Sequence, residues 1–238
     1  MAGLIAPAPS PLGLEALDDP RCPDELARAT LGDIAVVNRL FGGRAAAAFG
    51  LDRVLAGGPP PEDRLSLLDV GAGAGDVAAA LIRRAALRGI ELVPIAVDTH
   101  RMAAALCAAA GLATVVAGVA ALPFRDGGVD LILASQFLHH FSRPAAAELI
   151  GAFGRLARVG VIVSEPRRSV GAMAGIWVAA HALGLHPVTR RDGVLSVRRS
   201  FTSVELRRLL RDAGVTAPVW RRPGFRLVAA WRTGRAHG

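Results

Sequence analysis

Three glycines at alternate positions join an apolar segment to an alanine-rich one in the stretch 67–76, whose sequence is LLDVGAGAGD. The apolar residues before Gly71 predict a strand, and the residues after Gly75 predict a helix. Glycine adopts backbone conformations that other residues avoid, and the N-terminus of a helix presents free N–H groups. The chain is therefore predicted to contain a strand–turn–helix unit whose turn lets a ligand approach the bare backbone.

An acidic residue follows at the distance expected for a ribose-binding carboxylate. Asp98 closes the next apolar run, Glu91–Val97, and lies 23 positions after Gly75. In nucleotide-binding α/β folds a carboxylate about 20 residues after the glycines accepts hydrogen bonds from ribose hydroxyls. The pattern predicts an adenosine-containing cofactor.

Apolar runs and helical patterns alternate through the middle of the chain. The runs are continuous, which is typical of strands that helices cover on both faces. The alternation predicts an α/β fold with a doubly wound, mostly parallel sheet. The predicted strands are 66–70, 92–97, 113–117, 129–134 and 159–164, and the predicted helices between them are 75–88, 100–110 and 144–157.

The flanking segments divide the chain further. We expect a flexible tail over 1–22, an N-terminal helical cap over 23–61, and a main domain over 62–238 that contains a lid insert at 166–200. Short helices are predicted at 23–31, 33–40 and 44–55, and the lid is expected to hold an uncharged helix followed by an arginine-rich loop. Thr202 is a capping residue for a helix to position 213, and 215–221 and 225–232 predict a closing hairpin.

Composition excludes several kinds of enzyme. The 238 residues include 28 basic residues, all of them arginine, and no tyrosine. Without lysine the chain has no P-loop lysine, no Schiff-base lysine and no anchor for pyridoxal phosphate. It also lacks the Tyr–Lys pair of short-chain dehydrogenases. The net charge of +8 is spread along the whole chain, whereas a nucleic-acid site usually clusters its basic residues, so no nucleic-acid partner is expected.

Targeting and metal signals are weak. The N-terminus carries Glu15, Asp18 and Asp19 and no basic segment, so it does not resemble a signal peptide, and a cytoplasmic location is expected. Cys22 and Cys107 lie far apart and suggest neither a disulfide nor a metal site. The uncharged stretch 169–189 leaves open a helix lying on a membrane surface.

Two further segments carry a family resemblance. Residues 118–124 read GVAALPF, and residues 135–141, after Asp126 and Asp130, read SQFLHHF. Together with the glycine turn, these segments closely resemble class I S-adenosylmethionine-dependent methyltransferases of the ubiquinone/menaquinone-type branch, over roughly 66–165. The sequences NRLFGG at 38–43 and HPVTRRDGVLSVRRSFT at 186–202 resemble a bacterial subgroup that modifies polyketide-type or phenolic substrates.

This resemblance implies a Rossmann-like sheet of seven strands with an antiparallel last strand, and it assigns cofactor contacts. Asp98 would accept from the ribose hydroxyls and Thr99 would lie beside the adenosine. The family usually has an aspartate at position 119, so Val119 removes one acceptor for the adenine amino group. Such a hydrogen bond is worth about 1 kcal/mol. The S-adenosylmethionine contacts implied in full are Asp69, Gly71, Ala72, Gly73, Asp98, Thr99, Gly118, Val119, Ala120 and Ser135.

The histidines are the candidate catalytic residues. His139 and His140 follow the fourth strand, at the edge of the sheet where such sites open. One of them acts as a base or contacts the substrate, or else they cap the loop and pack under the lid. In the lid, Met173, Trp177 and His181 are spaced to share one helix face. This face either covers a hydrophobic acceptor, with His181 as the base, or is a packing stripe.

These features predict O-methylation of a hydroxyl on a small hydrophobic molecule of aromatic or polyketide type. His186, in the loop after the lid helix, is a weaker candidate for a substrate contact. The alternatives are C-methylation of a quinol-like ring and a non-catalytic protein that binds S-adenosylmethionine or a partner. No catalytic metal is expected, and the chain is predicted to be a monomer or a homodimer.

Overall fold

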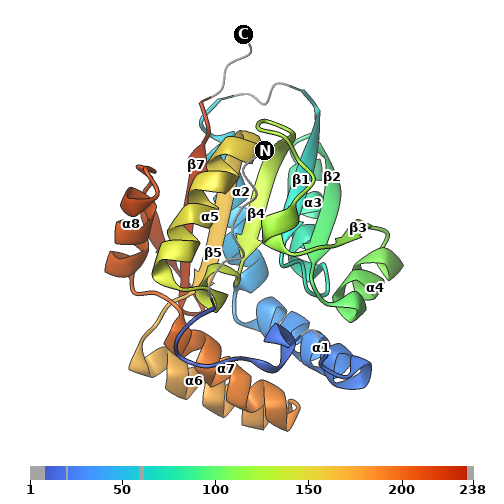
Figure 1. Cartoon of the computed structure of the whole chain (residues 1–238), viewed down its shortest axis with the longest axis vertical. Helices are drawn as coiled ribbons and strands as arrows, with labels where there is room; N and C mark the ends of the chain where they lie inside the picture. Colours follow the sequence, from blue (N-terminus) through green and yellow to red (C-terminus); the bar gives the residue numbers. More distant parts are fainter. Residues whose placement is uncertain (1–8, 20, 59–61, 235–238) are drawn as a thin grey trace.

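The computed structural model describes residues 9–19, 21–58 and 62–234. Their strands form one seven-stranded sheet in the order β3-β2-β1-β4-β5-β7-β6 (Figure 1). The first five strands pair in parallel, and β7 runs antiparallel to both β5 and β6. This confirms the predicted doubly wound, mostly parallel sheet. The strands are β1 (Arg64–Val70), β2 (Glu91–Asp98), β3 (Ala113–Val116), β4 (Val129–Ser135), β5 (Ala157–Pro166), β6 (Val219–Arg222) and β7 (Arg226–Arg232).

The central strands are buried on both faces because helices pack against each side. On one face α5 (Arg143–Leu156) and α8 (Ser203–Asp212) surround a core that includes Leu68 and Ile132. On the other face α2 (Gly43–Leu55), α3 (Asp76–Ala86) and α4 (Arg101–Ala109) enclose a second core that includes Leu67 and Leu131. The side chains of adjacent residues in one strand thus pack into opposite cores, because side chains alternate between the two faces of a sheet.

A third group of helices lies across the carboxyl ends of the parallel strands (Figure 1). It consists of α1 (Asp24–Leu40), α6 (Val170–Ala182) and α7 (Pro187–Arg199), and α7 packs against both α6 and α1. Two backbone contacts join the ends of the α6–α7 insert. The Arg168 N–H donates to the Phe201 carbonyl at 2.8 Å, and Arg167 and Phe201 form an isolated parallel β-bridge. The insert therefore begins and ends at one place, next to the end of β5.

Two local predictions were wrong. The two short helices expected at 23–31 and 33–40 are one continuous helix, α1, that runs through Gly32. A glycine inside a helix costs only about 1 kcal/mol, and packing of the buried side chains of α1 outweighs that cost. The arginine-rich loop expected in the lid is also helical. It is α7, which begins with His186 as its capping residue and Pro187 in its first turn.

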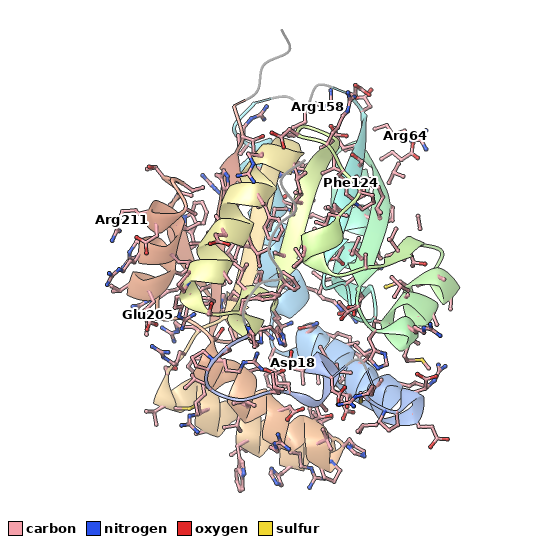
Figure 2. The ribbon with its side chains drawn as sticks, viewed as in Figure 1. Asp18, Arg64, Phe124, Arg158, Glu205 and Arg211 are labelled. Carbon is pink, nitrogen blue, oxygen red and sulfur yellow. The ribbon has the colours of Figure 1, made fainter. Side chains whose placement is uncertain are left out.

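The described part of the N-terminal segment is packed on the protein, unlike the loose tail that was expected. Ser10 donates its N–H to the His140 carbonyl at 2.8 Å, and a short 3-10 turn spans Ala16–Asp18. Figure 2 places Asp18 between the sheet and the layer of α1, α6 and α7. Among the described residues, no helix is both long and apolar enough to cross a membrane.

Candidate active site

The glycine turn after β1 has the backbone geometry that only glycine adopts easily. Gly71, Gly73 and Gly75 have φ angles of +69°, +56° and +71°, and α3 begins at the next residue. A side chain at Gly71 would lie 2.5 Å from the Phe137 ring. The turn therefore needs glycine both for its left-handed conformation and for a close approach.

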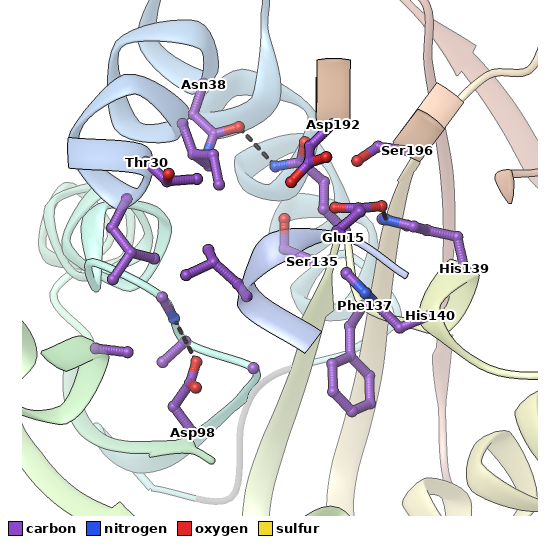
Figure 3. A pocket seen from close by; sticks show the side chains of 18 of the residues that line it. Glu15, Thr30, Asn38, Asp98, Ser135, Phe137, His139, His140, Asp192 and Ser196 are labelled. Atoms are coloured by element: carbon purple, nitrogen blue, oxygen red, sulfur yellow. Dashed lines mark hydrogen bonds and ion pairs between the residues drawn. The ribbon is translucent and has the colours of Figure 1, made fainter. Parts of the chain in front are cut away.

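Asp98 holds this turn from the end of β2. One carboxylate oxygen accepts from the Gly73 N–H at 3.0 Å and the other from the His100 N–H at 2.9 Å (Figure 3). Carboxylate oxygens have further lone pairs, so Asp98 can also accept from a ligand at the same edge. The sequence spacing between Gly75 and Asp98 thus corresponds to two neighbouring strand ends, because β1 and β2 pair in parallel.

Asp69 is a buried carboxyl under the turn. It is 2% exposed, and among the described residues its Oδ2 has no hydrogen-bond partner. Burial, and then the charges of Asp76 and Asp98, raise the pKa of Asp69 to about 8. A positively charged ligand group placed here would compensate the burial of this carboxylate.

One cavity of about 540 Å³ connects this turn to the third layer of helices. Phe137, Ile176 and Phe225 give much of its wall an apolar surface. Val119, 8% exposed, offers no side-chain acceptor there. All ten residues predicted to contact the cofactor line this cavity, namely Asp69, Gly71, Ala72, Gly73, Asp98, Thr99, Gly118, Val119, Ala120 and Ser135.

His139 and His140 also line the cavity, on a 3-10 turn that follows β4. Glu165, fully buried at the end of the neighbouring strand β5, fixes this turn. One of its oxygens accepts from the N–H groups of Phe137 and Leu138 at 2.9 and 2.8 Å, and the other lies 2.7 Å from His139 Nδ1. Glu165 therefore positions the histidine turn.

The N-terminal segment supplies two carboxylates that the sequence analysis did not place in the site. Glu15 Oε1 lies 3.6 Å from His139 Nε2 (Figure 3), and Asp18 Oδ1 lies 2.6 Å from His140 Nδ1. Both carboxylates line the cavity. The acidic run at the start of a strongly basic chain was the only available signal, and it was used to argue against a signal peptide.

Arg199, at the end of α7, holds this cluster together. Its side chain is fully buried, and its Nη1 lies 2.8 Å from Asp18 Oδ2 and 3.2 Å from Glu15 Oε1. The guanidinium also donates to the backbone carbonyls of His139 and His140. A buried guanidinium with these partners links the lid, the N-terminal segment and the histidine turn.

The cluster shifts the titration of its members. Burial disfavours the charged form of His139, but the carboxylates of Glu165 and Glu15 outweigh it and raise the pKa of His139 to about 9. Burial likewise opposes ionisation of Asp18, yet His140 and Arg199 hold the pKa of Asp18 well below its ordinary value. The pKa of Glu15 is also lowered, because its histidine neighbours outweigh burial.

The lid residues that were expected to face the substrate do not line the cavity. Trp177 is 55% exposed, and the exposed His181 donates from Nδ1 to the Trp177 carbonyl at 2.7 Å. Met173 shares their side of α6 and is likewise absent from the cavity wall, which Ala172 and Ile176 form instead. The inward stripe of α6 is therefore displaced by one residue from the predicted one, and Ile176 in this stripe lies against Gly193 of α7.

His186 also lies outside the cavity. Its Nδ1 accepts from the Val188 N–H at 3.2 Å, and its own N–H donates to Asp33 at 2.8 Å. This histidine caps α7 and ties the helix to α1. The lid contributes Thr189, Asp192 and Ser196 of α7 to the cavity instead.

Comparison with known proteins agrees with this arrangement. Residues 67–160 match the family described as a methyltransferase domain. An uncharacterized methyltransferase from Mycobacterium sp. (strain JLS) is 42% identical over 79 residues, which are 33% of this chain and 30% of the relative. The chain thus aligns with less than a third of the length of that relative.

Solved structures show the same fold over more of the chain. A SAM-dependent methyltransferase from Aquifex aeolicus superposes with a TM-score of 0.54 and 17% identity, covering 76% of this chain and 88% of that one. An O-methyltransferase family 2 protein from Planctomyces limnophilus, in complex with apigenin, superposes with a TM-score of 0.58 and 18% identity, covering 88% and 61%. The match over residues 67–160 and the shared fold agree with the resemblance to class I S-adenosylmethionine-dependent methyltransferases that the sequence motifs carry.

Proposed function

We propose that this protein transfers the methyl group of S-adenosylmethionine to a hydroxyl of a small, largely apolar molecule. The observation that carries the proposal is a single cavity with the glycine turn at one end and the histidine–carboxylate cluster at the other. The first end suits a nucleoside cofactor, and the second suits a hydroxyl that must lose its proton. The space between them is lined mostly by apolar side chains.

The cofactor end fits a cationic, ribose-bearing ligand. S-adenosylmethionine, when bound, supplies an electrophilic methyl group on a sulfonium sulfur. Asp69 would face its positively charged methionine end, the turn at Gly71–Gly73 would leave room for it, and Asp98 would accept from the ribose hydroxyls. Val119 would give the adenine only an apolar contact, so backbone groups would form the hydrogen bonds to the edge of the adenine ring.

The acceptor end places polar groups beside an apolar wall. Phe137, Phe141 and Ile176 line this region, and His139, His140 and Glu15 provide its polar groups. In the transfer a bond forms between the acceptor oxygen and the methyl carbon, the carbon–sulfur bond breaks, and the hydroxyl proton leaves. Positioning the oxygen in line with the sulfonium and lowering the cost of losing the proton are the tasks left to the protein.

Calorimetry with S-adenosylmethionine tests the first half of the proposal. We expect the wild-type protein to bind the cofactor and Asp98→Ala to bind it about tenfold or more weakly, because the ribose loses its acceptor. Asp52→Ala is the matched control, since Asp52 pairs with Arg84 and Arg88 away from the cavity. Absence of binding at millimolar cofactor would overturn the proposal and favour a non-catalytic protein.

A screen of phenolic acceptors with mass detection tests the second half. A product that gains one methyl group on oxygen supports the proposal. A ring-methylated product of a quinol-like acceptor would instead establish C-methylation, which the same end of the cavity serves if a neighbouring hydroxyl is deprotonated. Nuclear magnetic resonance of the product distinguishes the two positions.

A further inference from the structure

Three potential metal ligands gather at the acceptor end of the cavity. Glu15 offers a carboxylate oxygen and His139 and His140 each offer a ring nitrogen, and these atoms all lie within 4.8 Å of one another. Ligand atoms that sit about 2.1 Å from one ion lie at most about 4.2 Å apart. The 3.6 Å between Glu15 Oε1 and His139 Nε2 is already within that range.

The Nδ1 atom of each histidine ring lies next to a carboxylate oxygen, as is usual for histidines that bind a metal through Nε2. His139 Nδ1 lies 2.7 Å from Glu165 Oε2, and His140 Nδ1 lies 2.6 Å from Asp18 Oδ1. Metal-binding histidines usually donate their second ring N–H to a carboxylate or a carbonyl, which fixes the tautomer and orients the ligating nitrogen. Both rings therefore keep Nε2 as the nitrogen available to a ligand.

His139 Nε2 lies in an environment that requires a positive charge. The ring is 2% exposed, and among the described residues Nε2 has no hydrogen-bond partner. In a ring that carries only the Nδ1 proton, the Nε2 lone pair would face the Glu15 carboxylate, and two acceptors would face each other. In the metal-free protein a second ring proton lies between them, and a metal cation would take its place. A buried pair of acceptors is stable only when a proton or a cation lies between them.

The charges of the surrounding groups match a divalent cation. Glu15, Asp18 and Glu165 contribute three negative charges, and Arg199 contributes one positive charge, so the cluster carries −2 when both imidazoles are neutral. Arg199 contacts Glu15 and Asp18 directly and so shares both carboxylates with any ion bound there. A divalent ion at the Nε2 atoms would neutralise the remaining charge.

We infer that Glu15, His139 and His140 bind one divalent first-row transition-metal ion that holds the acceptor's oxygen. Two imidazoles and one carboxylate on one side of an ion leave its other positions open, which suits Zn²⁺, Co²⁺, Fe²⁺ or Mn²⁺. An ion in this position acts as a Lewis acid: it lowers the pKa of a bound hydroxyl and releases its proton to solvent. The oxygen then attacks the methyl carbon as the carbon–sulfur bond breaks.

The role of the ion rests on the proposed function, whereas its binding does not. The site also explains why residues far apart in the chain converge there. Glu15 comes from the N-terminal segment and the histidines follow β4, so the third ligand is present only when the N-terminal segment is seated. Sequence spacing could not reveal such a set.

Binding of Co²⁺ and Zn²⁺ to the full chain, without a polyhistidine tag, tests the site. Protein stripped with EDTA is titrated with Co²⁺ while its visible absorption is recorded, and bound Zn²⁺ is counted by elemental mass spectrometry. We expect one equivalent of ion. Glu15→Gln and His140→Gln should weaken binding at least tenfold, and the exposed His181→Gln should leave it unchanged. Far-ultraviolet circular dichroism confirms that each variant is folded, and neither test variant alters the fully buried His139.

The outcomes separate this inference from the proposed function. Absence of stoichiometric Co²⁺ binding to the folded protein, or equal binding by wild type and both variants, overturns the metal site. If the stripped protein still methylates a phenol at the wild-type rate in EDTA, the ion has no catalytic role, and the proposed function stands without a metal. If Co²⁺ binds through Glu15 and His140 but no hydroxyl compound is methylated, the site stands and the proposed function fails.

Discussion

The two ends of the cavity are built by different means. The cofactor end is formed mainly by backbone turns at neighbouring strand ends, with Asp69, Asp98 and the glycines lying close together in the chain. The acceptor end is an ionic cluster of side chains that come from the N-terminal segment, β4, β5 and α7. The first end is fixed by local sequence, and the second exists only once the tertiary fold has formed. Variants at each end of the cavity test this contrast.

Removal of the arginine at the centre of the acceptor end should have the largest effect. Arg199→Met leaves Glu15 and Asp18 without their buried cation, which typically costs about 3–5 kcal/mol of unfolding free energy. Arg198→Met changes the neighbouring exposed residue and should cost less than about 0.5 kcal/mol. Urea denaturation measures both. Equal costs would show that the cluster does not hold the N-terminal segment and lid in place.

The cofactor end should respond to a single methyl group. Gly71→Ala places a side chain 2.5 Å from the Phe137 ring, and Gly89→Ala has a similar left-handed backbone, with φ of +72°, but meets nothing within 4 Å. Both variants lose about 1–2 kcal/mol to backbone strain. Only Gly71→Ala should also weaken S-adenosylmethionine binding, by tenfold or more, measured by calorimetry. Equal cofactor affinity in the two variants would contradict a role for close approach at this turn.

The buried Asp69 should make stability depend on pH. Burial raises its pKa from 3.8 in the unfolded chain to about 8 in the folded protein, so the folded state holds a proton that the unfolded state loses in between. The free energy of unfolding should therefore fall as the pH rises from about 4 to about 8, by up to about 1.4 kcal/mol per pH unit. In Asp69→Asn this contribution should be absent. Denaturant midpoints at pH 5, 6 and 7 give the comparison, and parallel curves for the two proteins would refute it.

The smallest effects are expected on the outer face of α6. His181→Ala and Trp177→Ala change exposed side chains outside the cavity, so kcat/KM and unfolding free energy should change by less than about 0.5 kcal/mol. A much larger loss of kcat/KM in His181→Ala would restore the sequence-based hypothesis that this helix face covers the acceptor. His140→Ala, which removes a cavity residue, is the positive control.

The sequence predicted the sheet well, and the ten residues that it proposed as cofactor contacts line one cavity, because both predictions depend on local patterns. Continuous apolar runs identify strands buried on two faces, and the spacing from Gly75 to Asp98 identifies two adjacent strand ends. The helices of the third layer were harder to predict. Gly32 suggested a break in α1, and the arginines of α7 suggested a loop, but tertiary packing outweighed both local signals.

The acceptor end was predicted only in part for a physical reason. His139 and His140 follow a strand, so the fold rules located them. Glu15, Asp18 and Arg199 are joined to them by ion pairs between distant segments, and no periodicity or spacing encodes such pairs. The helical face of α6 was misassigned because Met173, Trp177 and His181 differ by only one position from the stripe that points inward.

The closed base of the α6–α7 insert has a consequence for how such a protein diversifies. Arg167 and Phe201 lie side by side, and a 2.8 Å hydrogen bond from Arg168 to Phe201 joins the two ends of the insert. A segment anchored in this way is an exchangeable module: its length and side chains can change while the strands on either side keep their register. If the proposed function holds, new acceptor preferences can arise in residues 169–200 without any change in the strands and turns that would hold the methyl donor.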